Sequence, residues 1–257
     1  MITFTDLTGK VMFEIFKREI GSFFSSLTGY VVIIVYLLIN SLFMWVLPGE
    51  WNIIDSGYAG LDTMFILSPW IFLFLVPAVT MRTIAEEKRS GTLEVLLSRP
   101  LTERQVVYGK FLGGVALVML AMIPGLIYYV SVYYLGETPG NLDIGGTWGA
   151  YIGLFFLASI YAACGVFASS LTDNQVVAFI IAVLISLIMY IGFETFSLIE
   201  GLGKLESFVS SLGINEHYRS MSRGVIDIND IVYFIVTIVI LMETSTLVLL
   251  SAKWKKQ

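Results

Sequence analysis

The chain alternates long apolar runs with short polar connections, and this pattern predicts a membrane protein. At the 1.5 Å rise of a helix, about twenty residues cover the roughly 30 Å hydrocarbon core of a bilayer. Six runs are near that length: residues 27–47, 63–80, 111–135, 148–171, 176–193 and 231–250. The predicted fold is therefore a single all-α integral membrane domain over residues 1–257, with six membrane-spanning helices.

The composition supports this class and argues against several functions. Hydrophobic residues make up 57% of the chain and charged residues only 14%, whereas a soluble domain carries about a quarter charged residues. The formal net charge of −5 argues against a nucleic-acid partner. A single cysteine, Cys164, excludes an internal disulfide framework, and a single histidine, His217, argues against a histidine-based metal site.

The basic residues predict the orientation. Twelve of the fifteen lysines and arginines lie in the N-terminal segment, the second connection and the C-terminus: Lys10, Lys17, Arg18, Arg82, Lys88, Arg89, Arg99, Arg104, Lys110, Lys253, Lys255 and Lys256. The first and third connections have none. Because cytoplasmic loops are enriched in lysine and arginine, both termini and the second connection are expected to be cytoplasmic, in the inner membrane.

Two segments outside the spans have helical periodicity. In residues 7–26, apolar side chains recur at helical spacing opposite Lys10, Glu14, Lys17 and Arg18, which predicts an amphipathic helix in the cytoplasmic interface. A solvated tail is the alternative. In the fifth connection, residues 194–230, a similar stripe over 198–212 predicts a helix lying on, or dipping into, the external leaflet.

The second connection, residues 82–104, is unusually charged for so apolar a chain. Residues 81–110 hold ten of the thirty-five acidic or basic residues. Gly91 allows a tight bend, Thr92 is suited to cap a short helix with Glu94 early in it, and Pro100 ends it. The result is a short helix with one apolar face at the membrane surface. The simplest interpretation is an anchor that fixes the orientation of the chain.

A resemblance to a known family gives this connection a second interpretation. EEKRSGTLEVLLSRPLTERQVVYGKF, residues 86–111, resembles the loop between spans two and three in permease subunits of ATP-binding-cassette (ABC) transporters of the ABC-2 type. HYRSMSRGVIDIND, residues 217–230, and the basic ending AKWKKQ are most similar to the gliding-motility-associated permeases of Bacteroidetes.

The resemblance implies a partner and a role. In that family the second connection carries a coupling helix that docks on the ATPase subunit, so the implied docking residues are Glu86, Glu87, Arg89, Gly91, Thr92, Glu94 and Leu97. Two ATPase chains would bind ATP and Mg²⁺, and a second permease chain, identical or different, would complete the transporter. The docked helices would pass the closure of the ATPases to the spans as rigid levers. Export of a substrate is the expected activity.

The sequence argues against catalysis by this chain. It contains no GxxxxGK[ST] phosphate-binding loop and no plausible set of nucleophile and base, so no cofactor is expected on it. Two other functions stay open. One is a scaffold that passes ATP-driven motion to envelope or gliding partners without moving a solute. The other is a secondary carrier, which the lack of an inverted repeat disfavours.

Three further features are candidates for function or for packing. Glu243 is the only charge inside a predicted span. It is expected to take part in coupling, to pair with the N-terminal helix, or to extend its carboxylate to the membrane interface. His217, Arg219 and Arg223 are candidates for contact with a lipid headgroup or an envelope accessory protein, against ordinary loop hydrogen bonds. Glycines at four-residue spacing, such as Gly109 and Gly113, permit close helix approach within the chain or between subunits.

Overall fold

The computed structural model describes residues 4–97, 101–197 and 206–254, and the elements in those ranges are all helical. They are α1 (Phe4–Ser25), α2 (Leu27–Ser41), the π-helical turn η1 (Leu42–Val46), α3 (Ile53–Ser56), α4 (Asp62–Thr80), α5 (Arg82–Arg89), α6 (Thr92–Leu97), α7 (Glu103–Leu135), α8 (Ile144–Leu171), α9 (Gln175–Leu187), the π-helical turn η2 (Ile188–Gly192), α10 (Phe193–Ser197), α11 (Glu206–Ser210), α12 (Ile214–Ser222) and α13 (Ile228–Trp254).

Six helices in the described residues are long and apolar enough to cross a membrane, which confirms the predicted number of spans. They cover Leu27–Val46, Asp62–Arg89, Glu103–Leu135, Ile144–Leu171, Gln175–Ser197 and Ile228–Ser251. The third begins eight residues before the predicted apolar run, because Thr102 and Gln105 form a reciprocal capping box at its start. A helix therefore starts at Thr102–Glu103 and runs directly into span three.

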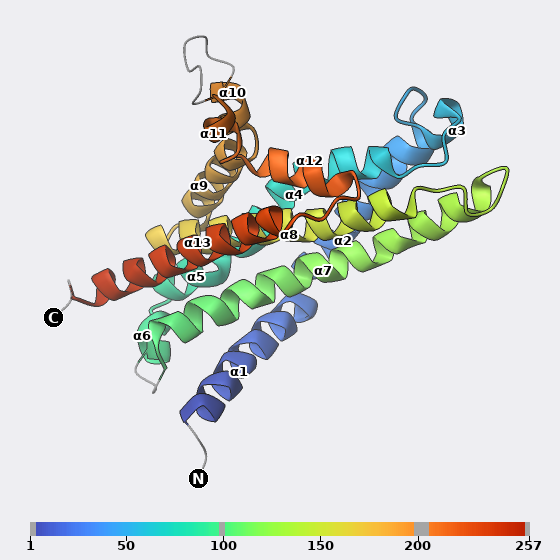
Figure 1. Ribbon diagram of the computed structural model, residues 1–257. Helices are drawn as coiled ribbons and strands as arrows, with labels where there is room; N and C mark the ends of the chain where they lie inside the picture. Colours follow the sequence, from blue (N-terminus) through green and yellow to red (C-terminus); the bar gives the residue numbers. More distant parts are fainter. Residues whose placement is uncertain (1–3, 98–100, 198–205, 255–257) are drawn as a thin grey trace.

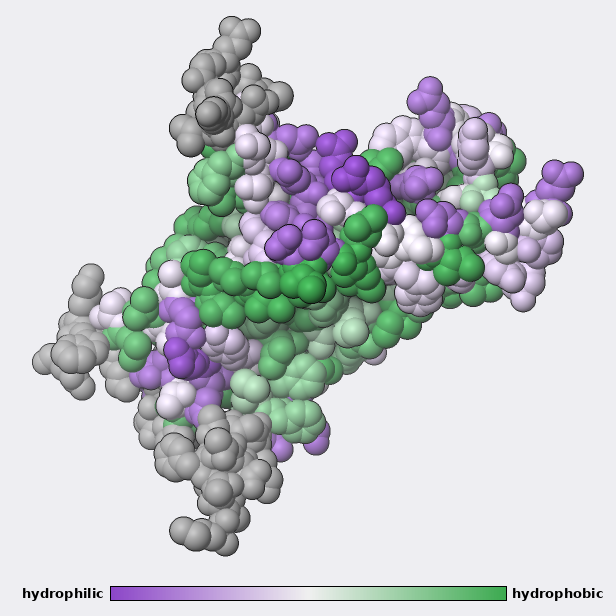
Figure 2. All heavy atoms as spheres, in the orientation of Figure 1, coloured by the Kyte–Doolittle hydropathy of each residue, from purple (hydrophilic) through white to green (hydrophobic). Residues whose placement is uncertain are grey.

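The helices form a bundle with two distinct ends (Figure 1). The starts of α1 and α7, the end of α13, and α5 and α6 lie at one end, called here the α6 end. α3, α10, α11 and α12 lie toward the other, called the α12 end. Figure 2 shows hydrophobic residues across the middle of the visible face and hydrophilic residues toward both ends, as expected of a chain that crosses a bilayer.

Helix α8 is the centre of the bundle, and it packs against α4, α7, α9, α12 and α13. Its buried residues are mainly small or aliphatic, as in the stretch from Ala158 to Ala163. Small side chains let neighbouring helices approach closely, which is how helices associate where lipid is as apolar as the helix surface. The most buried span therefore has the sequence that packing on several sides requires.

Other helices of the same chain pack against the glycines at four-residue spacing. A Cβ at Gly109 would lie 2.8 Å from Cγ2 of Ile15, and one at Gly113 would lie 2.7 Å from Cβ of Glu19, so α1 lies directly on α7 there. Gly149 and Gly153 of α8 face Met221 and Tyr218 of α12 in the same way. Packing within the chain accounts for this spacing.

A proline in α4 explains how α12 is attached. Pro69 lacks the N–H that would bond to the carbonyl of Phe65, four residues earlier. The phenol of Tyr218 donates to that carbonyl at 2.7 Å. Burial raises the pKa of Tyr218 well above its usual value, so the phenol stays protonated and able to donate. The neighbour that a proline needs in a membrane helix is here a side chain of α12.

A helix is present at the predicted interfacial segment, although its place in the membrane remains a prediction. α1 covers the predicted interfacial helix 7–26, with Ile15 and Phe23 buried and Lys17 and Arg18 exposed. The predicted stripe over 198–212 falls partly on residues 198–205, outside the described part of the chain. α11 covers its later portion, and residues 214–222, expected as loop, form α12.

The packing of α12 on α8 generates a stability prediction. Gly149→Ala places a methyl group against the backbone carbonyl of Met221, and such overpacking costs about 1–3 kcal/mol. Unfolding of the purified chain in detergent should therefore occur at a lower temperature than in the wild type. Gly21→Ala is the control, because nothing lies within 4 Å of a Cβ there and alanine favours the helix. Equal effects of the two substitutions would contradict this packing.

Candidate functional site

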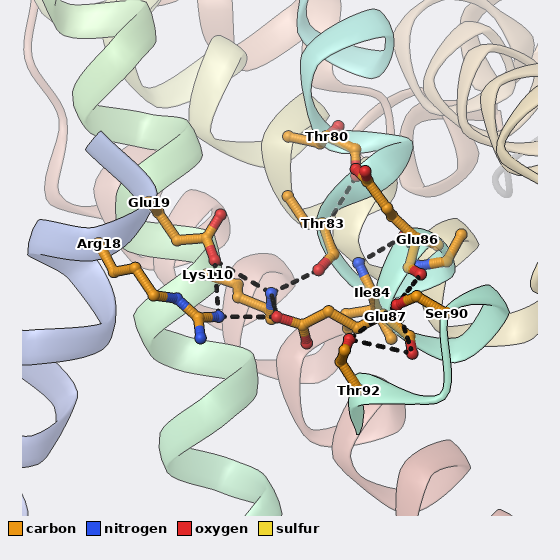
Figure 3. Close-up of polar contacts among 12 residues, drawn as sticks. Arg18, Glu19, Thr80, Thr83, Ile84, Glu86, Glu87, Ser90, Thr92 and Lys110 are labelled. Carbon is orange, nitrogen blue, oxygen red and sulfur yellow. Dashed lines mark hydrogen bonds and ion pairs between the residues drawn. The ribbon is translucent and has the colours of Figure 1, made fainter. Parts of the chain in front are cut away.

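A cluster of four charged side chains joins α1, α5 and α7 at the α6 end (Figure 3). It consists of Arg18, Glu19, Glu87 and Lys110, and is called here the junction cluster. Its centre is Lys110, whose side chain is only 1% exposed although it carries an ammonium group. A buried charge is very costly unless it is paired and hydrogen-bonded, so its partners decide whether this site is stable.

Each proton of the Lys110 ammonium has an acceptor. The Nζ atom lies 3.0 Å from Oε1 of Glu19, 2.9 Å from Oε1 of Glu87 and 2.5 Å from the carbonyl oxygen of Thr83. A lysine ammonium has three donors and no acceptor, so these contacts satisfy it completely. They come from two different helices, α1 and α5, while Lys110 itself belongs to α7.

The charges of the junction cluster balance. Glu87 also accepts from Nη2 of Arg18 at 2.7 Å, so two cations face two carboxylates. Moving α1 or α5 away from α7 would leave a buried charge without its partner, which costs several kcal/mol. The cluster therefore holds α1, α5 and α7 in one relative position, from which none can slide without breaking an ion pair.

Helix α5 is also attached to α8. The hydroxyl of Ser169 accepts from the backbone N–H groups of Ile84 at 2.9 Å and Ala85 at 2.8 Å, and donates to the carbonyl of Met81 at 2.9 Å. The ammonium of Lys88 donates to the carbonyl of Ser170. Because the first N–H groups of a helix have no partner inside it, Ser169 acts as a cap supplied by another helix.

The turn from α5 to α6 has the bend that the sequence predicts. Gly91 has a φ of 71°, a conformation that glycine adopts without strain, and this confirms the predicted bend. The hydroxyl of Ser90 donates to the carbonyl of Glu86 at 2.8 Å. The hydroxyl of Thr92, predicted to cap α6, lies 2.8 Å from that of Ser90 and so turns back toward α5.

The structure divides the predicted docking residues into two groups. Glu86, Arg89, Gly91, Thr92 and Glu94 are exposed on the outer surface of α5 and α6, and Leu93 is buried beneath them. Glu87 points the other way, into the junction cluster, and is not part of that surface. Leu97 ends α6, and its side chain lies outside the described part, as does Pro100, the predicted end of the helix.

Glu243 of α13 binds α7. Its carboxylate accepts from Nη2 of Arg104 at 2.6 Å and from the phenol of Tyr108 at 3.0 Å. Among the described residues, its partners therefore lie on α7 rather than on the N-terminal helix. The contact lies at the α6 end, where it joins the last span to the helix that also carries Lys110.

The residues predicted to make contacts at the α12 end differ in their availability. His217 is engaged within the chain, through Asp230 at 2.7 Å and the carbonyl of Ser211 at 2.8 Å, and its ring stacks on Tyr233. Arg219 and Arg223 are exposed, with Arg219 lying 3.3 Å from Glu194. A contact of the two arginines with lipid or protein stays a prediction.

Sequence reasoning missed Lys110 and Glu19 as members of a site. The available signal was the position of Lys110 between Gly109 and Gly113, which mark the face of α7 that another helix must approach. A charge on such a face needs a partner.

Among the described residues, no three His, Cys, Asp or Glu side chains lie together so as to hold a metal ion.

The junction cluster generates a second prediction. Lys110→Met leaves the carboxylates of Glu19 and Glu87 together with only Arg18 to balance them, which should lower the free energy of unfolding by about 3–5 kcal/mol. Lys17→Met, at an exposed position on α1, is the matched control and should change it by less than about 0.5 kcal/mol. Denaturant unfolding in micelles measures both. Similar values for the two variants would show that the cluster does not hold the helices.

Comparison with known proteins places the chain in a family. The model of the family described as ABC-2 family transporter protein matches residues 11–254, nearly the whole chain, whereas no curated protein matches it. Membership makes the chain a permease component of an ABC transporter, a generally non-catalytic multi-pass membrane subunit whose family implies an ABC ATPase as partner. The gliding-motility subfamily stays a prediction. The chain belongs to the ABC-2 family of transporter proteins.

Proposed function

We propose that this chain receives the movement of a separate ATPase at the outer surface of α5 and α6 and passes it into the membrane through the junction cluster. The observation that carries the proposal is the burial of Lys110 between carboxylates of α1 and α5. A docking surface is useful only if the element behind it is rigidly tied to the spans. Here that tie is an ion-pair cluster of four residues.

The docking surface has the chemistry of a partner contact. Glu86, Arg89 and Glu94 place charges of both signs at its rim, where they set register and partner choice. Leu93 of α6 is buried and holds this helix against the rest of the chain. The surface belongs to the cytoplasmic side, as the distribution of lysines and arginines predicts.

Movement of α5 would reach the bundle by three routes. α5 continues α4 across a single residue, Met81, so it moves with span two. Lys110 passes the displacement to α7 and, through Glu19, to α1. Ser169 passes it to α8. A packed interface of this kind shifts between discrete arrangements as a rigid lever rather than deforming continuously.

The complete transporter would contain two ATPase chains, which bind ATP and Mg²⁺, and a second permease chain, identical or different. Export across the inner membrane is the activity that this assembly supports. Substrate movement would separate a transporter from a scaffold of the envelope machinery. Vesicles reconstituted with the permease and its ATPase should move lipid or solute upon ATP hydrolysis if the chain is an exporter, and should hydrolyse ATP without such movement if it is a scaffold.

Docking generates the third prediction. Glu86→Lys/Glu94→Lys reverses two charges on the exposed surface, so the ATPase that co-purifies with the tagged wild-type chain from native membranes should be lost. The matched control is Glu50→Lys/Glu137→Lys, which makes the same charge change at exposed positions on the α12 end. The control should retain the ATPase. Undiminished co-purification with the first variant, or equal loss with the control, would reject α5 and α6 as the docking surface.

A further inference from the structure

A cavity lies at the α12 end, away from the junction cluster. It has a volume of about 650 Å³. Its walls include the starts of α4 and α8, the turn η2, α10 and α12. This volume is within the roughly 300–1,000 Å³ of typical ligand pockets. It is called here the α12 cavity, and it shares no residue with the proposed docking surface.

The charged residues lining the α12 cavity are mostly acidic. They are Asp62, Asp143 and Glu194, together with one cation, Arg219, and both aspartates are exposed. Glu194 is already compensated, because it accepts from Arg219 at 3.3 Å and from the amide of Asn215 at 2.6 Å. The remaining two carboxylates give the lining a net charge of −2.

The helix dipoles reduce this charge but do not cancel it. Asp62 is in the first turn of α4, and Asp143 caps α8 by accepting from the N–H of Gly146 at 2.9 Å. Each helix start contributes about half a positive charge, so together they offset roughly one of the two negative charges. The cavity is left with an excess of negative potential, which favours a cationic ligand over an anionic one.

Aromatic rings form part of the wall of the α12 cavity. Trp70 of α4 and Tyr190 of η2 meet edge to face, with ring centroids 5.5 Å apart, and Phe65 and Tyr218 complete this side. The face of an aromatic ring attracts an ammonium group, and tryptophan does so most strongly. Carboxylates and aromatic rings around one cavity are the combination that binds organic ammonium ions.

One wall of the α12 cavity continues along the apolar surface of span two. Ile66 and Trp70 line the cavity, and Phe74 follows one turn further along α4. These three side chains are 53%, 42% and 54% exposed, respectively, and lie at four-residue spacing on one face of the helix. A ligand with its head in the cavity can therefore extend an apolar tail over this face without crossing a polar region.

We propose that the α12 cavity binds the head of an amphiphilic cation, an amine or alkylammonium group, with its apolar tail against Ile66, Trp70 and Phe74. The carboxylates of Asp62 and Asp143 balance the charge, and the ring of Trp70 covers the head. Such a head occurs on membrane lipids that contain an amine and on amphiphiles that enter from water. Both sources present the same chemistry to the cavity.

The test uses the purified full-length chain in nanodiscs of phosphatidylglycerol, which has no amine. The probe is radiolabelled dodecyltrimethylammonium below its micelle-forming concentration, with binding to empty nanodiscs subtracted. Asp62→Asn/Asp143→Asn should weaken its binding at least tenfold, and asparagine still caps α8 at position 143. The control Glu50→Gln/Glu137→Gln removes the same charge from exposed positions at the same end of the bundle, and should bind within twofold of the wild type.

Two further measurements complete the test. Trp70→Leu keeps both carboxylates and should weaken binding severalfold, so it reports on the site even if the first variant does not fold. Unlabelled dodecyl sulfate, with the same tail and an anionic head, should not compete. Equal binding by the cavity and control variants, or full competition by dodecyl sulfate, would overturn the proposal.

The same assay separates the two sources of the ligand. In nanodiscs that contain phosphatidylethanolamine, a cavity that selects a lipid amine should lose the binding of the probe, because the lipid occupies it at high local concentration. A cavity that selects a water-borne amphiphile should bind the probe equally in both nanodiscs. Failure of this site would leave the docking proposal untouched, because no residue is shared between them.

Discussion

An ammonium group placed where no water reaches it fixes the arrangement of helices at one end of this protein. Lys110 is stable in that position only while α1 supplies Glu19 and α5 supplies Glu87 and the carbonyl of Thr83. Apolar contacts alone would allow α1 to slide or rotate on α7 at little cost, because an apolar helix surface makes similar contacts in many positions inside a membrane. The ion pairs remove that freedom, because each displacement leaves a charge without its partner.

Helix α8 connects the two ends of the molecule. Near one end, the hydroxyl of Ser169 holds the start of α5, and near the other, Gly149 and Gly153 make room for α12. The first attachment depends on a hydroxyl group and the second on the absence of side chains at the two glycines. The charged surface of α5 and α6 and the cavity beside α12 are therefore built on a single helix, and a shift of that helix would be felt at both.

The spans were predictable because about twenty apolar residues in a row admit few alternatives to a membrane helix. The bend at Gly91 followed from local chemistry in the same way. The direction of the Glu87 side chain could not be predicted. Its position in the sequence is compatible with an exposed or an inward carboxylate, and only the packing of α1 and α7 decides between them. The residues around His217 were expected as loop because their polar character hides a buried face formed by Ile214, Tyr218 and Met221.

The carbonyl of Phe65 has no hydrogen-bond donor four residues along its own helix, because that position is Pro69. The phenol of Tyr218 supplies the missing donor from another helix. A single proline thus turns part of the backbone of span two into a point of attachment for α12, and the bond competes with no hydrogen bond inside α4.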